Sequence, residues 1–172
     1  RHLAPNVNGP LSGIRVLELG SFIAGPFAGQ LLGDYGAEVI KVELPGIGDP
    51  LRKFGTPTKT GDTLCWLSEA RNKKSITLDL RKPDGAKILK RLVEQSDILV
   101  ENFQTGTMEG WGVGWDVLQT VNSKLIMVRI TGYGQTGPNA HRPGFGRIAN
   151  AFGGLSFLAG DPDRPPSTPG SP

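Results

Sequence analysis

The sequence predicts an α/β fold built around a mainly parallel β-sheet. Short apolar runs bounded by turn-forming residues alternate along the chain with amphipathic segments of helical period. The first strand, helix and strand follow one another within about 30 residues, the length of a βαβ unit, whose two strands pair in parallel. Continued alternation of this kind places helices on the faces of one parallel sheet.

The N-terminal segments supply the first βαβ unit. The run IRVLELG, residues 14–20, is short and apolar and predicts a buried strand. In the helix that follows, Pro26 suits the first turn and Gly36 suits the position just after the C-terminus. The run EVIKVE, residues 38–43, predicts the second strand.

The middle of the chain continues the pattern after a long interruption. Residues 45–70 have little period and predict an excursion from the sheet. Apolar and polar residues alternate over 75–80, which predicts a half-exposed strand. Residues 83–97 carry an apolar stripe of helical period and predict a helix, and ILVENF, residues 98–103, predicts the next strand.

The C-terminal part adds one more strand and two helical segments. Residues 115–122 predict a short helix, and residues 125–134 predict a strand that runs into a glycine-rich loop. Residues 146–160 predict a helix that breaks near Gly153 and Gly154, because glycine interrupts helical backbone.

Composition narrows the possible functions. The 172 residues suit one domain, and 25 glycines with 14 prolines indicate many loops. A net charge of +3 without a dense Lys/Arg stripe argues against a nucleic-acid partner and suits a small anionic ligand. One cysteine, Cys65, and two histidines argue against an internal disulfide and a Cys- or His-rich metal site. With no apolar run near 20 residues and no signal-like N-terminus, we expect a cytoplasmic protein without a membrane partner.

The loops after the strands are the candidate ligand sites, because parallel sheets bind ligands at the carboxyl ends of their strands. The loop LGSFIAGPFAG follows the first strand. Its glycines match neither the G-x-G-x-x-G of dinucleotide sites nor the Gly-Lys-Ser/Thr of a phosphate loop. The loop either presents N–H groups to an anion or allows close helix–sheet packing, and the residues leave both interpretations open.

Three other loops carry polar residues that suit a ligand. The stretch RNKKS, residues 71–75, offers cations to phosphates or is a solvated strand entry. Asn102 and Phe103 end a strand and offer a polar group and an aromatic face, or are ordinary loop and core residues. The loop 131–144, which contains Arg142, is rich in glycine and polar groups and is either a binding loop or a flexible one. With no nucleophile elbow in view, the residues indicate an α/β domain that binds an anionic, nucleotide-like ligand.

Four blocks occur together and in order: PLSGIRVLELGSFIAGPFAGQLLGDYGAEVIKVE, RNKKSITLDL, ILVENF and ITGYGQTGPNAHRPGF. In them the chain resembles the N-terminal part of class III CoA-transferases, the family of formyl-CoA and carnitine-type CoA-transferases and of α-methylacyl-CoA racemases. The resemblance implies a Rossmann-like large domain, incomplete in this chain, and an interlocked homodimer. It divides the chain into an N-terminal extension (1–9), the N-terminal part of the CoA-binding large domain (10–160), and a Pro/Gly-rich segment (161–172) that leads to the C-terminal remainder of the same protein.

The resemblance implies that the anionic ligand is coenzyme A or acyl-CoA, with a small carboxylic acid as second substrate and no metal. We add Arg142 as a candidate contact because it lies in the polar glycine-rich loop. The contacts that the resemblance implies lie in the first strand-to-helix turn, the basic stretch and the VENF strand: Ser21, Phe22, Ile23, Ala24, Asn72, Lys73, Asn102 and Phe103.

The resemblance also implies a covalent mechanism. An aspartate attacks the acyl-CoA thioester, and transfer of CoA proceeds through aspartyl intermediates, which divides one exchange into easier steps. In the family this aspartate follows a Pro/Gly-rich segment like residues 161–172, so we expect it just beyond Pro172. Asp161 and Asp163 precede the prolines and do not match that position.

Departures from the family pattern bear on the alternatives. Phe145 and Gly146 stand where racemases carry His-Asp, and phenylalanine cannot relay a proton, which disfavours an α-methylacyl-CoA racemase-like isomerase. Leu44 replaces an arginine of some relatives, and the segment around Gly110 lacks a basic residue that many carry. A non-catalytic nucleotide-binding Rossmann module is the other alternative, in which Glu43 at the end of the second strand would meet a ribose.

Overall fold

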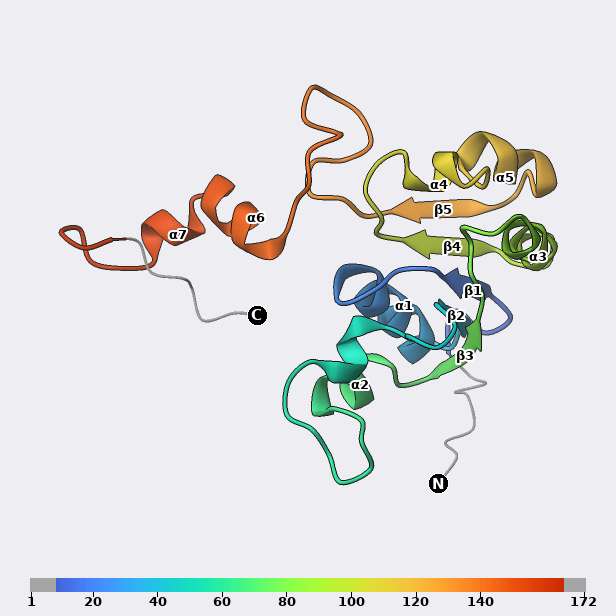
Figure 1. Ribbon diagram of the computed structural model, residues 1–172, viewed down its shortest axis with the longest axis horizontal. Coiled ribbons are helices and arrows are strands. Elements are labelled where there is room, and N and C mark those ends of the chain that lie inside the picture. The colour runs from blue at the N-terminus through green and yellow to red at the C-terminus, as the bar shows by residue number, and fades with distance from the viewer. Residues whose placement is uncertain (1–8, 166–172) are drawn as a thin grey trace. The chain divides into compact units, whose positions relative to one another are not determined.

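The computed structural model describes residues 9–165, which divide into two units (Figure 1). The first unit, which ends at Ile130, contains the β-sheet, and the second, which begins at Thr131, contains two short helices. The strands are β1 (Arg15–Glu18), β2 (Glu38–Glu43), β3 (Lys73–Thr77), β4 (Ile98–Glu101) and β5 (Ile126–Arg129). The helices are α1 (Ala24–Asp34), the 3-10 turn η1 (Pro50–Lys53), α2 (Leu64–Glu69), α3 (Pro83–Val93), α4 (Thr107–Gly110), α5 (Trp115–Val121), α6 (Gly146–Phe152) and α7 (Leu155–Leu158).

The five strands form one parallel sheet in the order β3-β2-β1-β4-β5, which confirms the predicted fold class. Leu17 of β1 lies in register with Ile40 of β2 on one side and with Leu99 of β4 on the other. The chain therefore leaves β1 in one direction along the sheet and later returns to its opposite side. Such a reversal opens a crevice at the carboxyl ends of β1 and β4, where open α/β sheets bind ligands.

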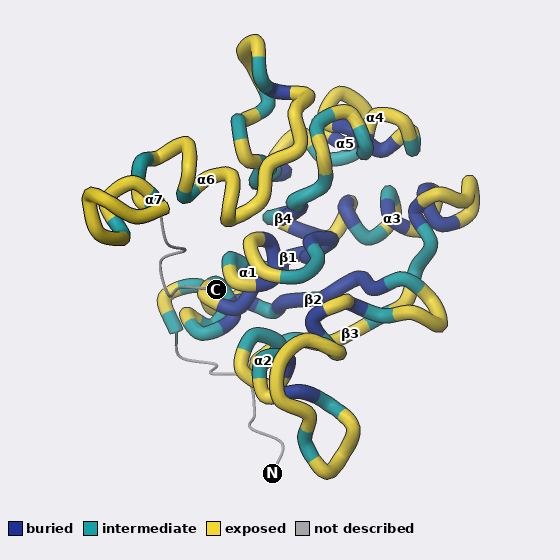
Figure 2. Tube along the Cα trace, turned by 60° about the vertical axis from the view of Figure 1, so that its left-hand side comes forward, coloured by how far each residue is buried: buried dark blue, intermediate teal, exposed yellow. Residues whose placement is uncertain are grey.

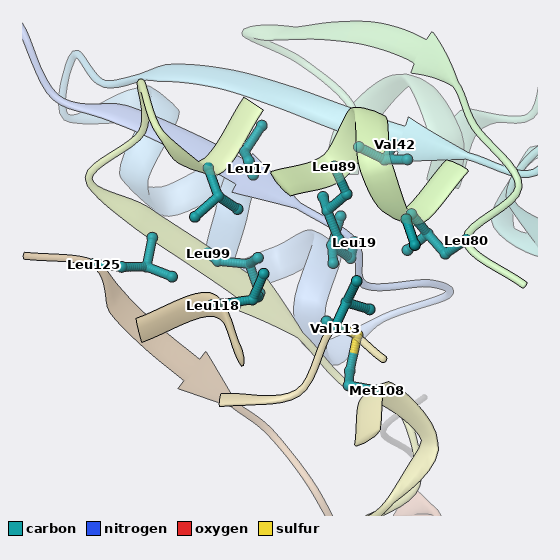
Figure 3. Close-up of a cluster of buried hydrophobic side chains, with 12 residues drawn as sticks. Leu17, Leu19, Val42, Leu80, Leu89, Leu99, Met108, Val113, Leu118 and Leu125 are labelled. Atoms are coloured by element: carbon teal, nitrogen blue, oxygen red, sulfur yellow. The ribbon is translucent and has the colours of Figure 1, made fainter. Parts of the chain in front are cut away.

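Apolar side chains alternate between the two faces of the central strands. Leu17 and Leu99 point into a core that also holds Leu89 of α3 and Leu118 of α5, and Figure 3 shows these leucines converging. The next residues along the strands, such as Val16, pack on the opposite face with the α1 side chains. The sheet is thus covered on both faces, and Figure 2 shows β1, β2 and β4 largely buried.

Glycines allow α1 to lie close against the sheet. A Cβ atom on Gly25 would lie 2.8 Å from the Cα of Gly20, and one on Gly29 would collide with the carboxylate of Glu18. Gly36 follows the helix with φ of +101°, which glycine adopts without steric cost, as predicted for the end of this helix. Close helix–sheet packing therefore accounts for the glycine spacing of the first loop.

The excursion between β2 and β3 contains two short elements that the sequence pattern did not reveal, η1 and α2. Each begins with a side-chain cap. Asp49 accepts a hydrogen bond from the Leu51 N–H (2.8 Å), and Thr63 accepts one from the Trp66 N–H (3.2 Å). Such caps satisfy backbone donors that a short helix leaves without partners.

Several element boundaries differ from the predicted ones. The second strand has the predicted bounds, whereas β3 begins two residues before the predicted strand and ends at Thr77. The strand predicted over 125–134 stops at Arg129, and the helix α4 was not predicted. The predicted break at Gly153 and Gly154 is confirmed, because α6 and α7 are separate helices on either side of it.

The second unit is small and exposes its apolar side chains. Its loop closes where Gly132 and Gly144 meet, because a Cβ on either residue would lie 2.6 Å from the Cα of the other. Tyr133 contacts Phe152 edge to face, with ring centroids 5.9 Å apart. Across residues 9–165, no helix is long and apolar enough to cross a membrane.

Candidate functional site

A pocket of about 320 Å³ lies at the carboxyl edge of the sheet, in the first unit. Its walls come from the ends of β1 and β2, from the segment after β3, from the start of the excursion and from the segment after β4. Parallel sheets bind ligands at this edge. The lining residues are Leu19, Gly20, Ser21, Val42, Glu43, Leu44, Ile47, Gly48, Asp49, Pro50, Leu78, Asp79, Leu80, Arg81, Phe103 and Trp111.

The pocket combines an apolar wall with one cation, Arg81, and three carboxylates, those of Glu43, Asp49 and Asp79. Phe103 and Trp111 contact each other edge to face, with ring centroids 5.1 Å apart, and stand beside leucine side chains from three strand ends. Arg81 brings a guanidinium group, held by two hydrogen bonds from Nε and an Nη to the Asp79 carboxylate (2.8 and 2.9 Å). An apolar slot with a positive group suits a flat heterocycle that carries phosphate.

Sequence reasoning missed the segment 78–81 and Trp111. The signal for the segment was present, since a predicted strand ended there and ligands bind where parallel strands end. The arginine at its end, Arg81, follows Asp79 and Leu80 and was not singled out. For Trp111 the sequence carries no signal of this kind, because the residue belongs to the pocket only through its contact with Phe103.

Three successive residues in the turn after β1 each have a backbone group held by a side chain from another element. The Lys41 ammonium donates to the Gly20 carbonyl (2.9 Å). Asn102 accepts from the Ser21 N–H (2.8 Å) and donates to the Ser21 carbonyl (2.9 Å). At the third residue, the Phe22 N–H donates to Asp49 Oδ1 (3.1 Å). The turn is therefore fixed before any ligand arrives.

These contacts decide which N–H groups of the turn can meet an anion. The N–H groups of Ser21 and Phe22 donate to protein side chains. Ile23, Ala24 and Gly25 stand at the N-terminus of α1, where the backbone N–H groups have no intrahelical acceptor. Helix N-termini favour anions, so the first turn of α1 is the part of the loop that suits a phosphate.

A cluster of four buried charges lies beneath this turn. Lys41 Nζ is 2.8 Å from Glu18 Oε1 and 2.8 Å from Asp49 Oδ2, and Lys73 Nζ is 2.8 Å from Glu18 Oε2. The two lysines and two carboxylates balance in charge, as buried ions must. Burial lowers the pKa of Lys73, although the neighbouring Glu18 opposes the shift.

The structure brings together most of the residues predicted to bind the ligand. Ser21 and Phe103 line the pocket, Asn102 bonds to Ser21, and Phe22 continues the same turn into α1. Ile23 and Ala24 head the helix.

Asn72 lies elsewhere, and Lys73 is buried beneath α1. The Asn72 amide donates to Asp34 Oδ1 (2.7 Å) at the far end of α1, beside the amino end of β3. The Lys73 side chain is 2% exposed and donates to the Pro26 carbonyl (2.6 Å) from beneath the helix. These contacts give both residues a structural role, and ligand binding by them stays a prediction.

Arg142 and the two C-terminal aspartates belong to the second unit. The Arg142 N–H donates to the Asn139 carbonyl (2.9 Å) within the loop that Gly132 and Gly144 close. Asp161 Oδ2 lies 3.8 Å from Arg164 Nε, and both side chains are exposed. A ligand contact by Arg142 stays a prediction.

Glu43 is not available to bind a ribose. Its carboxylate accepts hydrogen bonds from the Arg52 guanidinium (2.8 and 2.9 Å) and the Ser75 hydroxyl (2.5 Å), and also from the Asp49 N–H. Burial alone would raise the pKa of Glu43, but the hydrogen bonds from Arg52 and Ser75 outweigh it and hold the pKa at about 2. The carboxylate is thus an ionised structural anchor, which removes the contact on which a NAD-type site would depend.

The described residues 9–165 hold no group of three or more His, Cys, Asp or Glu side chains placed to bind a metal ion. The site as built offers an apolar slot, an arginine and a helix N-terminus. This set of groups can hold a phosphorylated nucleotide through contacts from the protein alone.

Comparison with known proteins finds relatives along most of the chain. The model of CoA-transferase family III matches residues 11–172. The chain is 60% identical over 162 residues to the succinyl-CoA–L-malate CoA-transferase β subunit of Chloroflexus aurantiacus, covering 94% of this chain and 40% of that protein. It is 45% identical to the succinyl-CoA:glutarate CoA-transferase of Mus musculus, covering 94% of this chain and 37% of that protein.

A solved structure shares the fold. The crystal structure of a CAIB/BAIF family protein from Brucella suis matches with a TM-score of 0.87 at 40% identity, covering 95% of this chain and 44% of that one. The chain thus spans about two fifths of the length of the relatives that it matches.

Proposed function

Because this chain belongs to CoA-transferase family III, we propose that it supplies the CoA-binding part of an enzyme that transfers coenzyme A from an acyl-CoA thioester to a carboxylic acid. The observation that carries the proposal is the pocket at the carboxyl edge, whose lining includes Gly20 and Ser21 of the turn that leads into α1. The slot and the helix start supply the two environments that the nucleotide half of CoA needs, one apolar and one that stabilises negative charge.

The adenine ring of CoA fits the apolar part of the pocket. Leu44, Leu80 and the Phe103–Trp111 pair supply apolar and aromatic surface for a flat ring. The diphosphate then lies at the N–H groups that head α1, and Arg81 meets the remaining phosphate. We also propose Arg142 as a contact in the second unit.

The names of the relatives suggest the substrates. The two relatives named above use succinyl-CoA, with L-malate or glutarate as acceptor, and a third from Chloroflexus aurantiacus is a succinyl-CoA–D-citramalate CoA-transferase. We therefore propose succinyl-CoA as donor and a dicarboxylate as acceptor for the protein that carries this chain. The Chloroflexus malate enzyme is named by α and β subunits, and we propose a second copy or a related chain as the partner here.

The reaction that we propose is a double displacement on an aspartate. The carboxylate attacks the thioester carbonyl, the carbon–sulfur bond breaks, and CoA leaves as the thiolate with an acyl–aspartyl anhydride remaining. The thiolate attacks the aspartyl carbonyl, the acyl carboxylate leaves, and an aspartyl–CoA thioester forms. The acceptor carboxylate then repeats these two steps in reverse and departs as the new acyl-CoA. We place the aspartate beyond Pro172, and Asp161 and Asp163 are not part of the proposal.

A racemase-like reaction is a weaker candidate. It needs a base where Phe145 stands, and the phenylalanine side chain cannot take up a proton. Phe145 caps the start of α6, and its side chain is largely exposed.

Two measurements on the whole protein test the proposal. Isothermal titration should give saturable binding of CoA and no binding of NAD at the same concentrations. Incubation with succinyl-CoA and free L-malate or glutarate should yield the acceptor's CoA ester, with succinate released in equal amount. Tight binding of NAD without binding of CoA would instead support the nucleotide-binding module.

A further inference from the structure

The turn between β1 and α1 holds a non-glycine residue in a left-handed conformation. Phe22 has φ of +67°, a region that is unfavourable for residues with a Cβ atom. Such backbone persists only where surrounding contacts fix it, and it is concentrated at ligand sites. The contacts that hold the Phe22 peptide therefore also set the direction of the N–H groups of the residues that follow it, Ile23–Gly25.

Asp49 is the side chain that accepts a hydrogen bond from the N–H of this peptide. It is buried at the start of η1, and its Oδ1 accepts from the N–H groups of Phe22 (3.1 Å) and Leu51 (2.8 Å). Its Oδ2 is 2.8 Å from the ammonium group of Lys41, which in turn donates to the Gly20 carbonyl. One carboxylate thus joins the excursion, the strand β2 and the turn.

We infer that Asp49 is a positioning residue of the CoA site, which fixes the backbone of Phe22 and thereby aims the N–H groups of Ile23–Gly25 at the phosphates. The inference rests on the proposed function. Asp49 also lines the pocket, but a carboxylate repels a phosphate, so direct contact does not explain its presence there. Its pairing with Lys41 neutralises that repulsion and leaves its hydrogen bonds to hold the turn.

The test is Asp49→Asn in the whole protein, a change that keeps the side-chain volume. The carboxamide oxygen can still accept from one side, but its NH₂ group then faces the Lys41 ammonium or the Phe22 N–H, so two donors meet. We expect the Kd for CoA to rise about tenfold or more, equivalent to about 1.4 kcal/mol. Hydrogen exchange of the peptide that contains Phe22 should quicken by a similar factor, while kcat at saturating acyl-CoA changes less than about threefold.

Asp62→Asn is the matched control. Asp62 lies in the same excursion, its side chain is partly exposed, and it faces Arg52 at 3.6 Å. The substitution is chemically identical and removes a charge from the same segment. The Kd for CoA and the exchange of the Phe22 peptide should both stay within about twofold of wild type.

A second background separates positioning from general damage. Glycine adopts positive φ without cost, so Phe22→Gly should hold the turn without help from Asp49. In that background Asp49→Asn should change the Kd for CoA by less than about threefold, a coupling that a double-mutant cycle reports directly. If Asp49→Asn alone fails to fold, recovery of the fold by Phe22→Gly supports the inference, and no recovery contradicts it.

Two results would overturn the inference: unchanged exchange of the Phe22 peptide in Asp49→Asn, or an equal loss of CoA affinity in both backgrounds. A wild-type protein that does not bind CoA would remove the proposed function instead. Exchange of the Phe22 peptide would still decide whether Asp49 holds the turn.

Discussion

Single side chains hold the turn between β1 and α1, and Asn102 does so through both ends of its amide. Its oxygen accepts from the Ser21 N–H and its nitrogen donates to the Ser21 carbonyl, which ties the end of β4 to the turn after β1. The pair spans the point where the strand order reverses, which is the place where such sheets bind ligands. Asn102 therefore fixes the width of the crevice.

Asn102→Ala should weaken CoA binding as well as the fold. Loss of the two hydrogen bonds should lower the free energy of unfolding by about 1–3 kcal/mol and raise the Kd for CoA about tenfold. Denaturant titration and calorimetry measure the two effects separately.

Asn122→Ala is the matched control. Asn122 also donates to two backbone carbonyls, those of Val93 (3.0 Å) and Ser96 (2.8 Å). None of these three residues lines the pocket. It should destabilise the protein to a similar extent and leave the Kd for CoA unchanged. Equal loss of CoA affinity in the two variants would contradict a specific role for Asn102.

Also at the scale of residues, some site residues could be predicted from the sequence and others could not. Asn102 and Phe103 were candidates from their position after a strand, and Ser21 was named through the family resemblance. Ser21 and Phe103 line the pocket, and Asn102 bonds to Ser21. The basic stretch was interpreted either as cations that meet phosphates or as a solvated strand entry. Because β3 begins at Lys73, the side chains of Lys73 and Lys74 instead point to opposite sides of the sheet. Lys73 is 2% exposed and Lys74 is 67% exposed, as that period requires.

At the scale of elements, the excursion is held to the sheet by a clamp around Glu43. Arg52 donates two hydrogen bonds to the Glu43 carboxylate and stacks on the Trp66 ring, with its guanidinium carbon 3.9 Å from the ring centre. Glu43 also accepts from the N–H of Asp49. The clamp thus fixes the segment that supplies one wall of the pocket.

The clamp should depend on pH in a defined window. The pKa of Glu43 is lowered from its ordinary value of 4.5 to about 2, because hydrogen bonds from Arg52 and Ser75 outweigh the effect of burial. A depressed carboxyl pKa stabilises the fold above the unfolded pKa, and this stability is lost as the pH falls from about 4.5 towards 2.

Glu43→Gln should remove that contribution. The variant should be less stable than wild type near neutral pH by about 3 kcal/mol, and the difference should shrink as the pH falls through the window. Denaturant unfolding at a series of pH values measures it, with Glu94→Gln as an exposed control that should stay within about 0.5 kcal/mol of wild type. A difference for Glu43→Gln that does not vary with pH would contradict the clamp.

Element boundaries were harder to predict than element types. The strand β2 had the predicted bounds because Val39, Ile40 and Val42 favour a strand and the turn-forming residues Pro45 and Gly46 follow soon after it. The helices η1 and α2 are too short to show a helical period, and they depend on the caps supplied by Asp49 and Thr63. The pair Asp49-Pro50 is a typical helix start and was the signal available in the sequence.

At the scale of the whole molecule, the fold class followed from the alternation of strands and helices, whereas the pocket did not. The pocket forms where five separate segments meet, and only tertiary packing brings Leu80 and Trp111 to the same place as Ser21. One sign of the pocket was present in the sequence, because the apolar strands β1 and β2 contain the charged residues Glu18 and Lys41. Buried charges need partners, and theirs lie directly beneath the turn between β1 and α1.

The central claim is that the pocket at the carboxyl edge of the sheet binds the nucleotide half of CoA. A crystal structure of the protein with CoA tests it most directly. We predict the adenine ring between Leu80 and the Phe103–Trp111 pair, with the diphosphate about 3 Å from the N–H groups of Ala24 and Gly25. Adenine bound outside this pocket, or a diphosphate bound away from the N-terminus of α1, would contradict the account.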